Sequence, residues 1–221
     1  KYMRFLKTLN KNLDYGIECY LKMNSDLMFE QVQFAKYGEY SSKSFDEVNK
    51  KVYSNREVME YYMHGILLSQ FLWKNHYEML SFFIKYLPKY KKKARNYLEI
   101  GGGHGLFISE AIKILGKNVV FDFIDVSPFS LEISKRFVNN KKVNYKLRDV
   151  LKFKTDKKYD FIVMGEVLEH VEEPQRLLLK LRDLINSDGC VYITTPTNAP
   201  AIDHIYLFKN TQEIKDMLKK A

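Results

Sequence analysis

The chain is 221 residues long, 46% hydrophobic and 14% aromatic, which excludes an intrinsically disordered protein and leaves room for one α/β domain with a helical extension. No apolar run approaches the roughly 18 residues that a membrane-spanning helix needs, so we expect no membrane partner. The net charge of +9 favours an anionic partner, or it reflects only a well-solvated, lysine-rich surface. Cys19 and Cys190 have no metal-binding or redox spacing, so we expect a reducing, cytoplasmic compartment.

The first part of the chain has the pattern of an all-helical segment. Apolar residues recur there at helical spacing, most clearly from Arg56 to Leu87. Asn55 can cap the start of that helix, and Pro88 marks its end. The sequence therefore predicts helices throughout residues 1–94.

From Arg95 onward, short apolar runs alternate with amphipathic stretches. The runs predict five strands, at residues 97–100, 119–124, 143–147, 159–164 and 190–194. The amphipathic stretches predict helices at residues 106–115, 128–138, 174–185 and 210–220. Such alternation implies right-handed crossovers and a parallel sheet with helices on both faces. We therefore expect an α/β fold with a Rossmann-like sheet in residues 95–221, preceded by the helical segment.

A carboxylate and a glycine cluster follow the first predicted strand, in the run Glu99-Ile100-Gly101-Gly102-Gly103-His104-Gly105. Glycines there let the backbone turn sharply and approach a ligand closely, and ligands of open α/β sheets bind at this crevice. The dinucleotide fingerprint is not met, because Leu106 occupies its third glycine position, and the Lys-Ser/Thr of a P-loop is missing. Glu99 would repel a pyrophosphate and suits a ligand with an ammonium and a sulfonium. Taken alone, the cluster is equally compatible with a simple tight turn.

The run Glu99-x-Gly101-x-Gly103-x-Gly105 resembles the first motif of class I S-adenosylmethionine-dependent methyltransferases. The resemblance continues in order over about residues 95–210. Asp125-Val126 matches the ribose-binding position, Asp149-Val150 the adenine-contact motif, and the run 159–164 the fourth strand. The resemblance implies S-adenosyl-L-methionine as cofactor, bound by Glu99, Gly101, Gly103, Gly105, Asp125, Val126, Asp149, Val150 and Glu166.

A second group of polar residues follows the fourth predicted strand. If a helical turn forms there, Glu166, Glu169 and His170 share one face, and His204 comes from the loop after the fifth strand, a neighbour at the top of such a sheet. Two carboxylates and imidazoles suit Mg²⁺ or Mn²⁺. The Glu-x-x-Glu-His pattern is similar to that of small-RNA 3′-terminal 2′-O-methyltransferases and ubiquinone-biosynthesis O-methyltransferases. Two alternatives stay open: the motif only shapes its loop, or His170 or His204 acts as a metal-free general base.

The resemblance also implies a role for residues 1–94, because methyltransferases of this class commonly carry a substrate-recognising helical addition. Aromatic and histidine side chains of this segment either line a pocket or form ordinary core: Tyr37, Tyr40, Tyr61, Tyr62, His64, Trp73 and His76. We expect O-methylation of a small polar or anionic metabolite, with His170 and His204 as catalytic residues.

Two other functions compete with small-molecule O-methylation. One is RNA 2′-O-methylation, although no RNA-binding module or strong basic stripe is visible. The other is a non-catalytic subunit that only binds S-adenosylmethionine. Class I methyltransferases usually add a sixth and a seventh strand, which this chain does not reach, so we expect several dozen further residues beyond Ala221.

Overall fold

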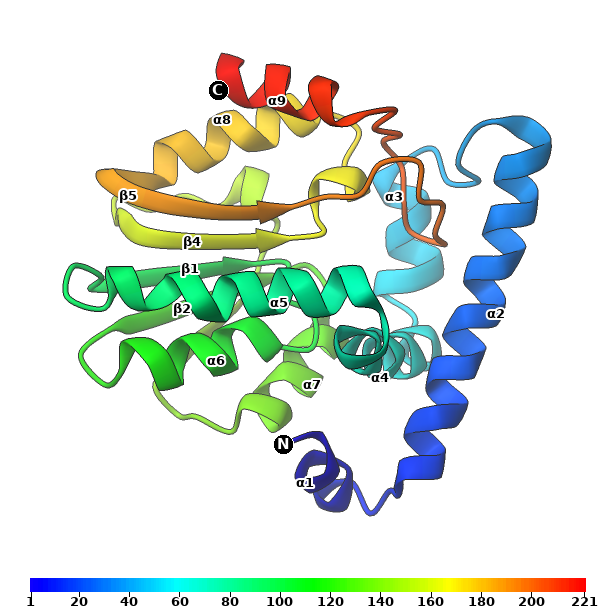
Figure 1. The fold of residues 1–221 in the computed structure, drawn as a ribbon, viewed down its shortest axis with the longest axis horizontal. Coiled ribbons are helices and arrows are strands. Elements are labelled where there is room, and N and C mark those ends of the chain that lie inside the picture. The colour runs from blue at the N-terminus through cyan, green and yellow to red at the C-terminus, as the bar shows by residue number, and fades with distance from the viewer.

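Five parallel strands form one sheet in the order β3-β2-β1-β4-β5 (Figure 1). The computed structural model describes residues 1–221. The strands are β1 (Asn96–Ile100), β2 (Val120–Asp125), β3 (Val143–Leu147), β4 (Tyr159–Gly165) and β5 (Ile185–Thr194). All five predicted strands are present, and the predicted α/β, Rossmann-like fold is confirmed.

The central strands are buried on both faces, which explains their nearly continuous apolar sequences. Because successive side chains of a strand point to opposite faces, Tyr97 and Phe161 join the core on one side of the sheet, whereas Leu98 and Ile162 join the core on the other side. Glu99 points to the same face as Tyr97, and its side chain is 1% exposed. A carboxyl group therefore stands at the carboxyl end of β1 among apolar neighbours.

Helices cover both faces of the sheet. The core that contains Tyr97 is closed by α5 (Lys74–Tyr86), α6 (Leu106–Leu115) and α7 (Pro128–Val138). The opposite core is closed by the 3₁₀ turn η3 (Val150–Lys152), α8 (Pro174–Leu184) and α9 (Thr211–Lys220). Helix α7 is capped at its start, since the Ser127 hydroxyl accepts a hydrogen bond from the Ser130 N–H.

Residues 1–94 are helical as predicted, but they do not form a single unit. Their elements are α1 (Tyr2–Thr8), α2 (Leu13–Tyr37), α3 (Phe45–Val48), the π-helical turn η1 (Asn49–Tyr53), α4 (Arg56–Leu72), α5 and the 3₁₀ turn η2 (Leu87–Tyr90). By its packing α5 belongs to the layer on the sheet. The division into a cap of residues 1–94 and a domain of residues 95–221 stays a prediction.

The single helix predicted from Arg56 to Leu87 is wrong, because Trp73 interrupts it with an extended conformation (φ −98°, ψ 129°). The Trp73 indole donates a hydrogen bond to the Tyr20 hydroxyl of α2 at 2.7 Å. On either side of the break, α4 buries Met59 against Met23 of α2, and α5 buries Phe83 against the sheet. One straight helix cannot turn its apolar face toward both partners, so the chain bends between them.

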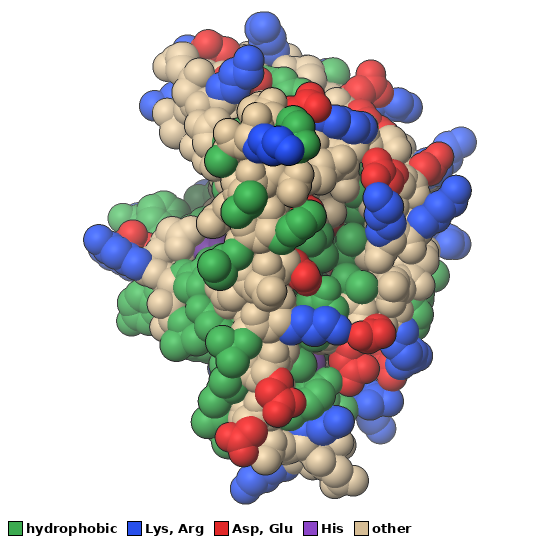
Figure 2. Space-filling model, turned by 90° about the vertical axis from the view of Figure 1, so that its right-hand side faces the viewer, with side chains coloured by type: hydrophobic (Ala, Val, Ile, Leu, Met, Phe, Trp, Pro, Cys, Tyr) green, Lys and Arg blue, Asp and Glu red, His purple; other side chains and the backbone are tan.

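The carboxyl ends of the strands point toward α2, α3 and α4 (Figure 1). Helices α2 and α4 cross closely, since a Cβ on Gly65 would stand 2.8 Å from the Cβ of Met23. The outer face of α2 carries exposed apolar side chains, among them Leu21 and Met28 (Figure 2). None of the helices combines the length and the apolar character needed to cross a membrane.

Candidate functional site

A cavity of about 880 Å³ is lined both by the carboxyl edge of the sheet and by residues of α2 to α5. This volume lies near the upper end of the roughly 300–1,000 Å³ that is typical of small-molecule binding pockets. Most predicted site residues line it: Glu99, Gly101, Gly103, Asp125, Val126, Asp149, Val150, Glu166, His170 and His204.

The glycine loop makes the sharp turn that its sequence predicts. Gly101, Gly103 and Gly105 have φ values of 61°, 51° and 75°, a left-handed region that side chains disfavour. The turn places Gly101 and Gly103 on the cavity wall, but Gly105 is not among the lining residues. Gly105 instead starts α6 against α7, where a Cβ would meet the Val138 side chain at 2.9 Å. Gly105 therefore has a packing role, and its predicted cofactor contact stays a prediction.

Glu99 faces the cavity with half of its carboxylate unpaired. Oε2 accepts a hydrogen bond from the Tyr97 hydroxyl at 2.7 Å, whereas the buried Oε1 has no partner. Burial raises the pKa of Glu99 to about 8. A cation placed beside Oε1 would restore the charged form and satisfy the orphaned oxygen.

Asp125 closes the end of β2 next to this loop. Its Oδ1 accepts from the Ser127 N–H at 2.8 Å, and its Oδ2 accepts from the Gly103 N–H at 3.2 Å. Burial raises the pKa of Asp125 to about 6, opposed by these backbone hydrogen bonds. Asp149 lies at the same edge of the sheet, where its Oδ1 accepts from the Leu151 N–H. Two carboxylates thus stand at the ends of β2 and β3, at the positions that the resemblance predicts.

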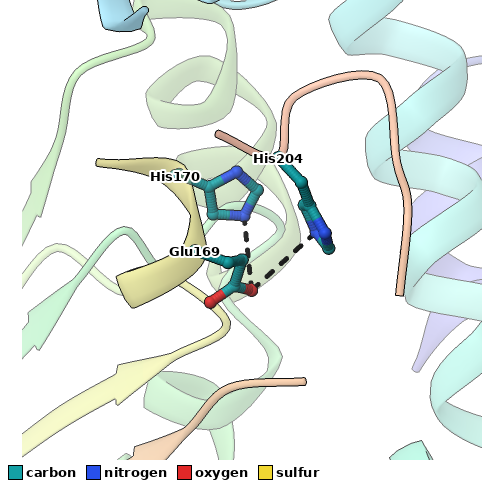
Figure 3. A group of neighbouring side chains, drawn as sticks. All are labelled: Glu169, His170 and His204. Atoms are coloured by element: carbon teal, nitrogen blue, oxygen red, sulfur yellow. Dashed lines mark ion pairs between the residues drawn. The ribbon is translucent and has the colours of Figure 1, made fainter. Parts of the chain in front are cut away.

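Glu169, His170 and His204 form one cluster (Figure 3). The Oε1 atom of Glu169 lies 3.5 Å from Nε2 of His170 and 3.9 Å from Nε2 of His204. Glu169 is fully buried, its Oε2 accepts from the Thr195 hydroxyl at 2.8 Å, and its Oε1 has no hydrogen-bond partner. Both dashed lines in Figure 3 end on this unpaired oxygen.

Backbone carbonyls decide which nitrogens of the two imidazoles carry protons. Nδ1 of His170 lies 2.8 Å from the Asp203 carbonyl oxygen, and Nδ1 of His204 lies 2.5 Å from the Ala199 carbonyl oxygen. Because a carbonyl only accepts, both Nδ1 atoms donate, and a neutral ring then presents an unprotonated Nε2. The two Nε2 atoms and Oε1 of Glu169 point toward one another. A shared proton or a bound cation between them would stabilise this arrangement.

The two histidines differ in their electrostatic surroundings. Burial lowers the pKa of His204 to about 4, so this ring is neutral near pH 7. Burial alone would lower the pKa of His170 as well, but the nearby charges of Asp203 and Glu169 raise it. His204 is thus the stronger candidate for a neutral base or ligand, and His170 is the ring that more readily holds a proton.

Glu166 does not join this cluster, contrary to the predicted set of four ligands. Only three of the residues have ligand atoms within 4.8 Å of one another. The helical turn η4 spans Leu168–His170 alone, and Glu166 precedes it with a left-handed φ of 54°. The Glu166 side chain lines the same cavity, and burial together with the nearby charge of Glu169 raises its pKa to about 8.

Two residues of the site, Tyr53 and Asp203, were missed by the sequence interpretation. Tyr53 of η1 places its hydroxyl 3.1 Å from Nδ1 of His170 and 3.4 Å from Oδ2 of Asp203. Tyr62 of α4 donates to Oδ1 of Asp203 at 3.4 Å. The position of Asp203 directly before His204 was a usable signal. Nothing in the sequence links Tyr53 or Tyr62 to residues more than 100 positions away.

The aromatic and histidine side chains of residues 1–94 divide between cavity and packing. Tyr62, Trp73 and His76 line the cavity. The remaining four are not among the lining residues: Tyr37 is exposed, Tyr40 accepts from the Ala199 N–H, Tyr61 donates to Asp26, and His64 bonds with Tyr2. His76 is therefore the histidine of this segment that can meet a ligand.

Comparisons with known proteins agree with this geometry. A profile of the methyltransferase-domain family matches residues 72–219. The malonyl-[acyl-carrier protein] O-methyltransferase 1 of Ilyobacter polytropus is 30% identical over 105 residues, which cover 47% of this chain and 39% of that protein. The ubiquinone biosynthesis O-methyltransferase of Coxiella burnetii is 27% identical over 131 residues, which cover 58% of this chain and 54% of that protein. The matched regions thus span about half, or less, of these curated relatives.

The fold also resembles solved structures. The crystal structure of the N-methyltransferase NodS from Bradyrhizobium japonicum WM9 in complex with S-adenosyl-L-homocysteine matches with a TM-score of 0.53 and 19% sequence identity. The match covers 66% of this chain and 74% of that chain. At this identity the likeness concerns the fold alone.

Proposed function

Because the chain belongs to the class I S-adenosylmethionine-dependent methyltransferases, as its family match over residues 72–219 shows, we propose that it methylates a hydroxyl oxygen of a small molecule. One observation carries this proposal. A single cavity is lined by the buried carboxylates of Glu99 and Asp125 and by His170 and His204, whose Nε2 atoms converge on Glu169. Glu99 and Asp125 are suited to bind the methyl donor. The cluster of Glu169, His170 and His204 is suited to bind the hydroxyl that receives the methyl group.

The donor side of the proposal follows the charges of the cavity. The unpaired Oε1 of Glu99 is suited to the ammonium of S-adenosylmethionine. Asp125 is suited to the ribose hydroxyls, because its oxygens can accept further hydrogen bonds beyond those from Gly103 and Ser127. Asp149, with Val126 and the buried Val150, supplies a mixed polar and apolar setting for the adenine.

The reaction needs positioning and the removal of one proton. A bond forms between the acceptor oxygen and the methyl carbon while the bond from that carbon to the sulfonium breaks, and its electron pair stays on sulfur. The products are a methyl ether, S-adenosylhomocysteine and a proton. A cavity that holds both reactants supplies the alignment. The unprotonated Nε2 of His204 is placed to take the proton, with His170 as the neighbouring candidate.

As the alternative to this metal-free base, we propose a divalent cation, Mg²⁺ or Mn²⁺, at Glu169, His170 and His204, where the two Nε2 atoms serve as ligands. The residues fit such an ion, since Oε1 of Glu169 is buried without a partner and faces two Nε2 atoms whose rings are fixed through Nδ1. When bound, the cation would lower the pKa of the acceptor hydroxyl and orient it. Glu166 is not among the three convergent ligands. We therefore propose that it contacts the methyl donor instead.

The metal proposal is tested by a conservative substitution. Glu169→Gln keeps the size of the side chain and removes one anionic ligand, so we expect Mn²⁺ affinity to fall by at least about 10-fold. Equilibrium dialysis followed by elemental analysis measures this loss, with the exposed Glu173→Gln as the matched control. If the wild-type protein binds no Mn²⁺, the metal proposal is wrong and a metal-free histidine base remains. Methyl transfer that a chelator leaves unchanged would support that alternative.

The reaction itself is tested with labelled methyl donor and a metabolite extract. We expect label to appear in small, base-stable ethers and not in RNA. Label in RNA, together with RNA binding that weakens steeply with salt, would favour the RNA 2′-O-methyltransferase alternative. Donor binding without transfer to any acceptor would favour the non-catalytic subunit.

A further inference from the structure

The half of the cavity built by the N-terminal helices is mainly apolar and rich in methionine, with Gln31, Gln70, Asn75 and His76 as uncharged polar residues. Four of the eight methionines of the chain line it, namely Met23, Met59, Met63 and Met79. Phe34 of α2 and Trp73, between α4 and α5, add aromatic surface. Methionine side chains are flexible and polarizable, so they adapt to apolar ligands of different shapes.

This half of the cavity also lacks positive charge. Residues 1–79 contain eleven lysines and arginines. All eleven are exposed, and none lines the cavity. Figure 2, which looks at the side of the molecule formed by α2, shows lysine and arginine side chains on the outer surface. Asp46 is the only charged lining residue from this part of the chain, and its charge is negative.

The cations that do line the cavity follow β3 or belong to α8. Arg148 and Lys152 flank the proposed adenine contact at Asp149, and Lys152 lies 3.6 Å from the Asp149 carboxylate. Arg176 of α8 pairs with Glu173 at 3.3 Å. An anionic acceptor bound among the methionines would therefore lose its hydration without a counter-charge, which is strongly unfavourable.

We infer that the methyl acceptor is an uncharged molecule with a largely apolar body, which lies against the methionine-rich wall and turns one hydroxyl toward Glu169, His170 and His204. This inference rests on the proposed function and gives its acceptor a chemical class. It departs from the anionic acceptor suggested by the net charge of +9, because the lysines and arginines of residues 1–79 lie on the outer surface and not on the methionine-rich wall. The adaptable wall accepts several molecules that share this apolar character.

The test uses the only tryptophan of the chain as a reporter. Trp73 is half-buried and lines the cavity, so excitation at wavelengths above phenol absorption reports occupancy without any methyl transfer. The two ligands are 4-hexylphenol and 6-(4-hydroxyphenyl)hexanoate, which share the phenol and a six-carbon chain and differ in the terminal carboxylate. We expect the neutral phenol to bind, as measured by the change in Trp73 fluorescence, with a Kd at least 10-fold lower than that of the carboxylate. A carboxylate that binds equally well or better, or no binding of either ligand, overturns the inference.

Two neighbouring variants localise the effect. Leu27 lines the cavity, whereas Met28 on the same helix is 66% exposed and lies outside it. Leu27→Lys should reverse the preference toward the carboxylate, and Met28→Lys should leave it unchanged. A reversal in Met28→Lys, or none in a folded Leu27→Lys, would contradict the inferred position. Calorimetry with S-adenosylmethionine is run in parallel, so a failure of donor binding is distinguished from a failure of the acceptor inference.

Discussion

Glu99 and Glu169 share an unusual state, since each buries a carboxylate with one oxygen hydrogen-bonded and the other unpaired. Burial raises the pKa of both groups. A buried carboxylate without a counter-charge destabilises the folded protein, and such groups are retained most often at sites that bind a ligand. The two unpaired oxygens therefore support the proposed donor site at Glu99 and the proposed metal site at Glu169.

The first residue-scale prediction concerns the pH dependence of donor binding. The pKa of Glu99 is about 8 in the free protein, so Glu99 is protonated at pH 6 and must lose its proton to pair with an ammonium. Affinity for S-adenosylmethionine should rise between pH 6 and 7.5, by up to about 10-fold per pH unit. Calorimetry of wild type and Glu99→Gln measures this, and the variant should bind at least about 10-fold more weakly without this dependence on pH. A wild-type Kd that is constant over this range would exclude the role of Glu99.

The same group affects the stability of the free protein. Because the pKa of Glu99 in the folded state lies above its ordinary value of 4.5, its contribution to stability is fully present below pH 4.5. That contribution is lost as the pH rises toward 8. Between pH 4.5 and pH 8, the unfolding free energy of the wild type should therefore fall relative to that of Glu99→Gln. Urea unfolding at pH 5 and pH 8 provides the comparison.

Asp125 carries the second residue-scale prediction. Asp125→Ala removes a charged acceptor for the ribose hydroxyls and also releases the Gly103 N–H. Each hydrogen bond to a charged group contributes about 1.5–3 kcal/mol, so we expect affinity for S-adenosylmethionine to fall at least 10-fold. Calorimetry measures the change, with the exposed Asp188→Ala as control. Unchanged affinity in Asp125→Ala would remove the ribose role.

At the scale of elements, the crossing of α2 and α4 forms one wall of the cavity. Gly65 of α4 faces Met23 of α2 so closely that an added Cβ would lie 2.7 Å from the Met23 sulfur. Gly65→Ala should lower the free energy of unfolding by about 1–3 kcal/mol, although alanine favours helices by about 1 kcal/mol. Denaturant unfolding measures the loss. The double variant with Met23→Ala should lose less than the sum of the single changes, and strict additivity would contradict direct contact.

The interruption at Trp73 shows what the apolar periodicity of one segment can predict and what it cannot. The apolar periodicity from Arg56 to Leu87 identified helix correctly on both sides of Trp73. The bend itself comes from packing against two partners, α2 and the sheet. It also places Trp73 and His76 on the cavity wall. A pattern within one segment cannot indicate that its two halves face different neighbours.

At the scale of the whole molecule, the cavity exists only because the N-terminal helices face the carboxyl edge of the sheet. A ligand bound there stabilises the folded chain by mass action. S-adenosylmethionine at 100 times its Kd should add about 2.7 kcal/mol, which for a chain of this length raises Tm by about 5–10 °C. A thermal-shift titration measures this, with NAD at the same concentration as control. Equal stabilisation by NAD would contradict the assignment of the crevice to a positively charged nucleoside.

The sequence by itself determined the order of strands and helices, the turn at the glycine loop and the acids at the ends of β1, β2 and β3. These features depend on burial periodicity, backbone sterics and hydrogen bonds between near neighbours, all of which act over a few residues. Only the tertiary structure decided that Gly105 packs against Val138 and that Glu166 stays outside the group of Glu169, His170 and His204. It alone brought Tyr53 to His170, and it placed the positive charges of the N-terminal helices outside the cavity. Those outcomes depend on contacts between segments far apart in the chain, because side chains share a site only after the elements that carry them have packed.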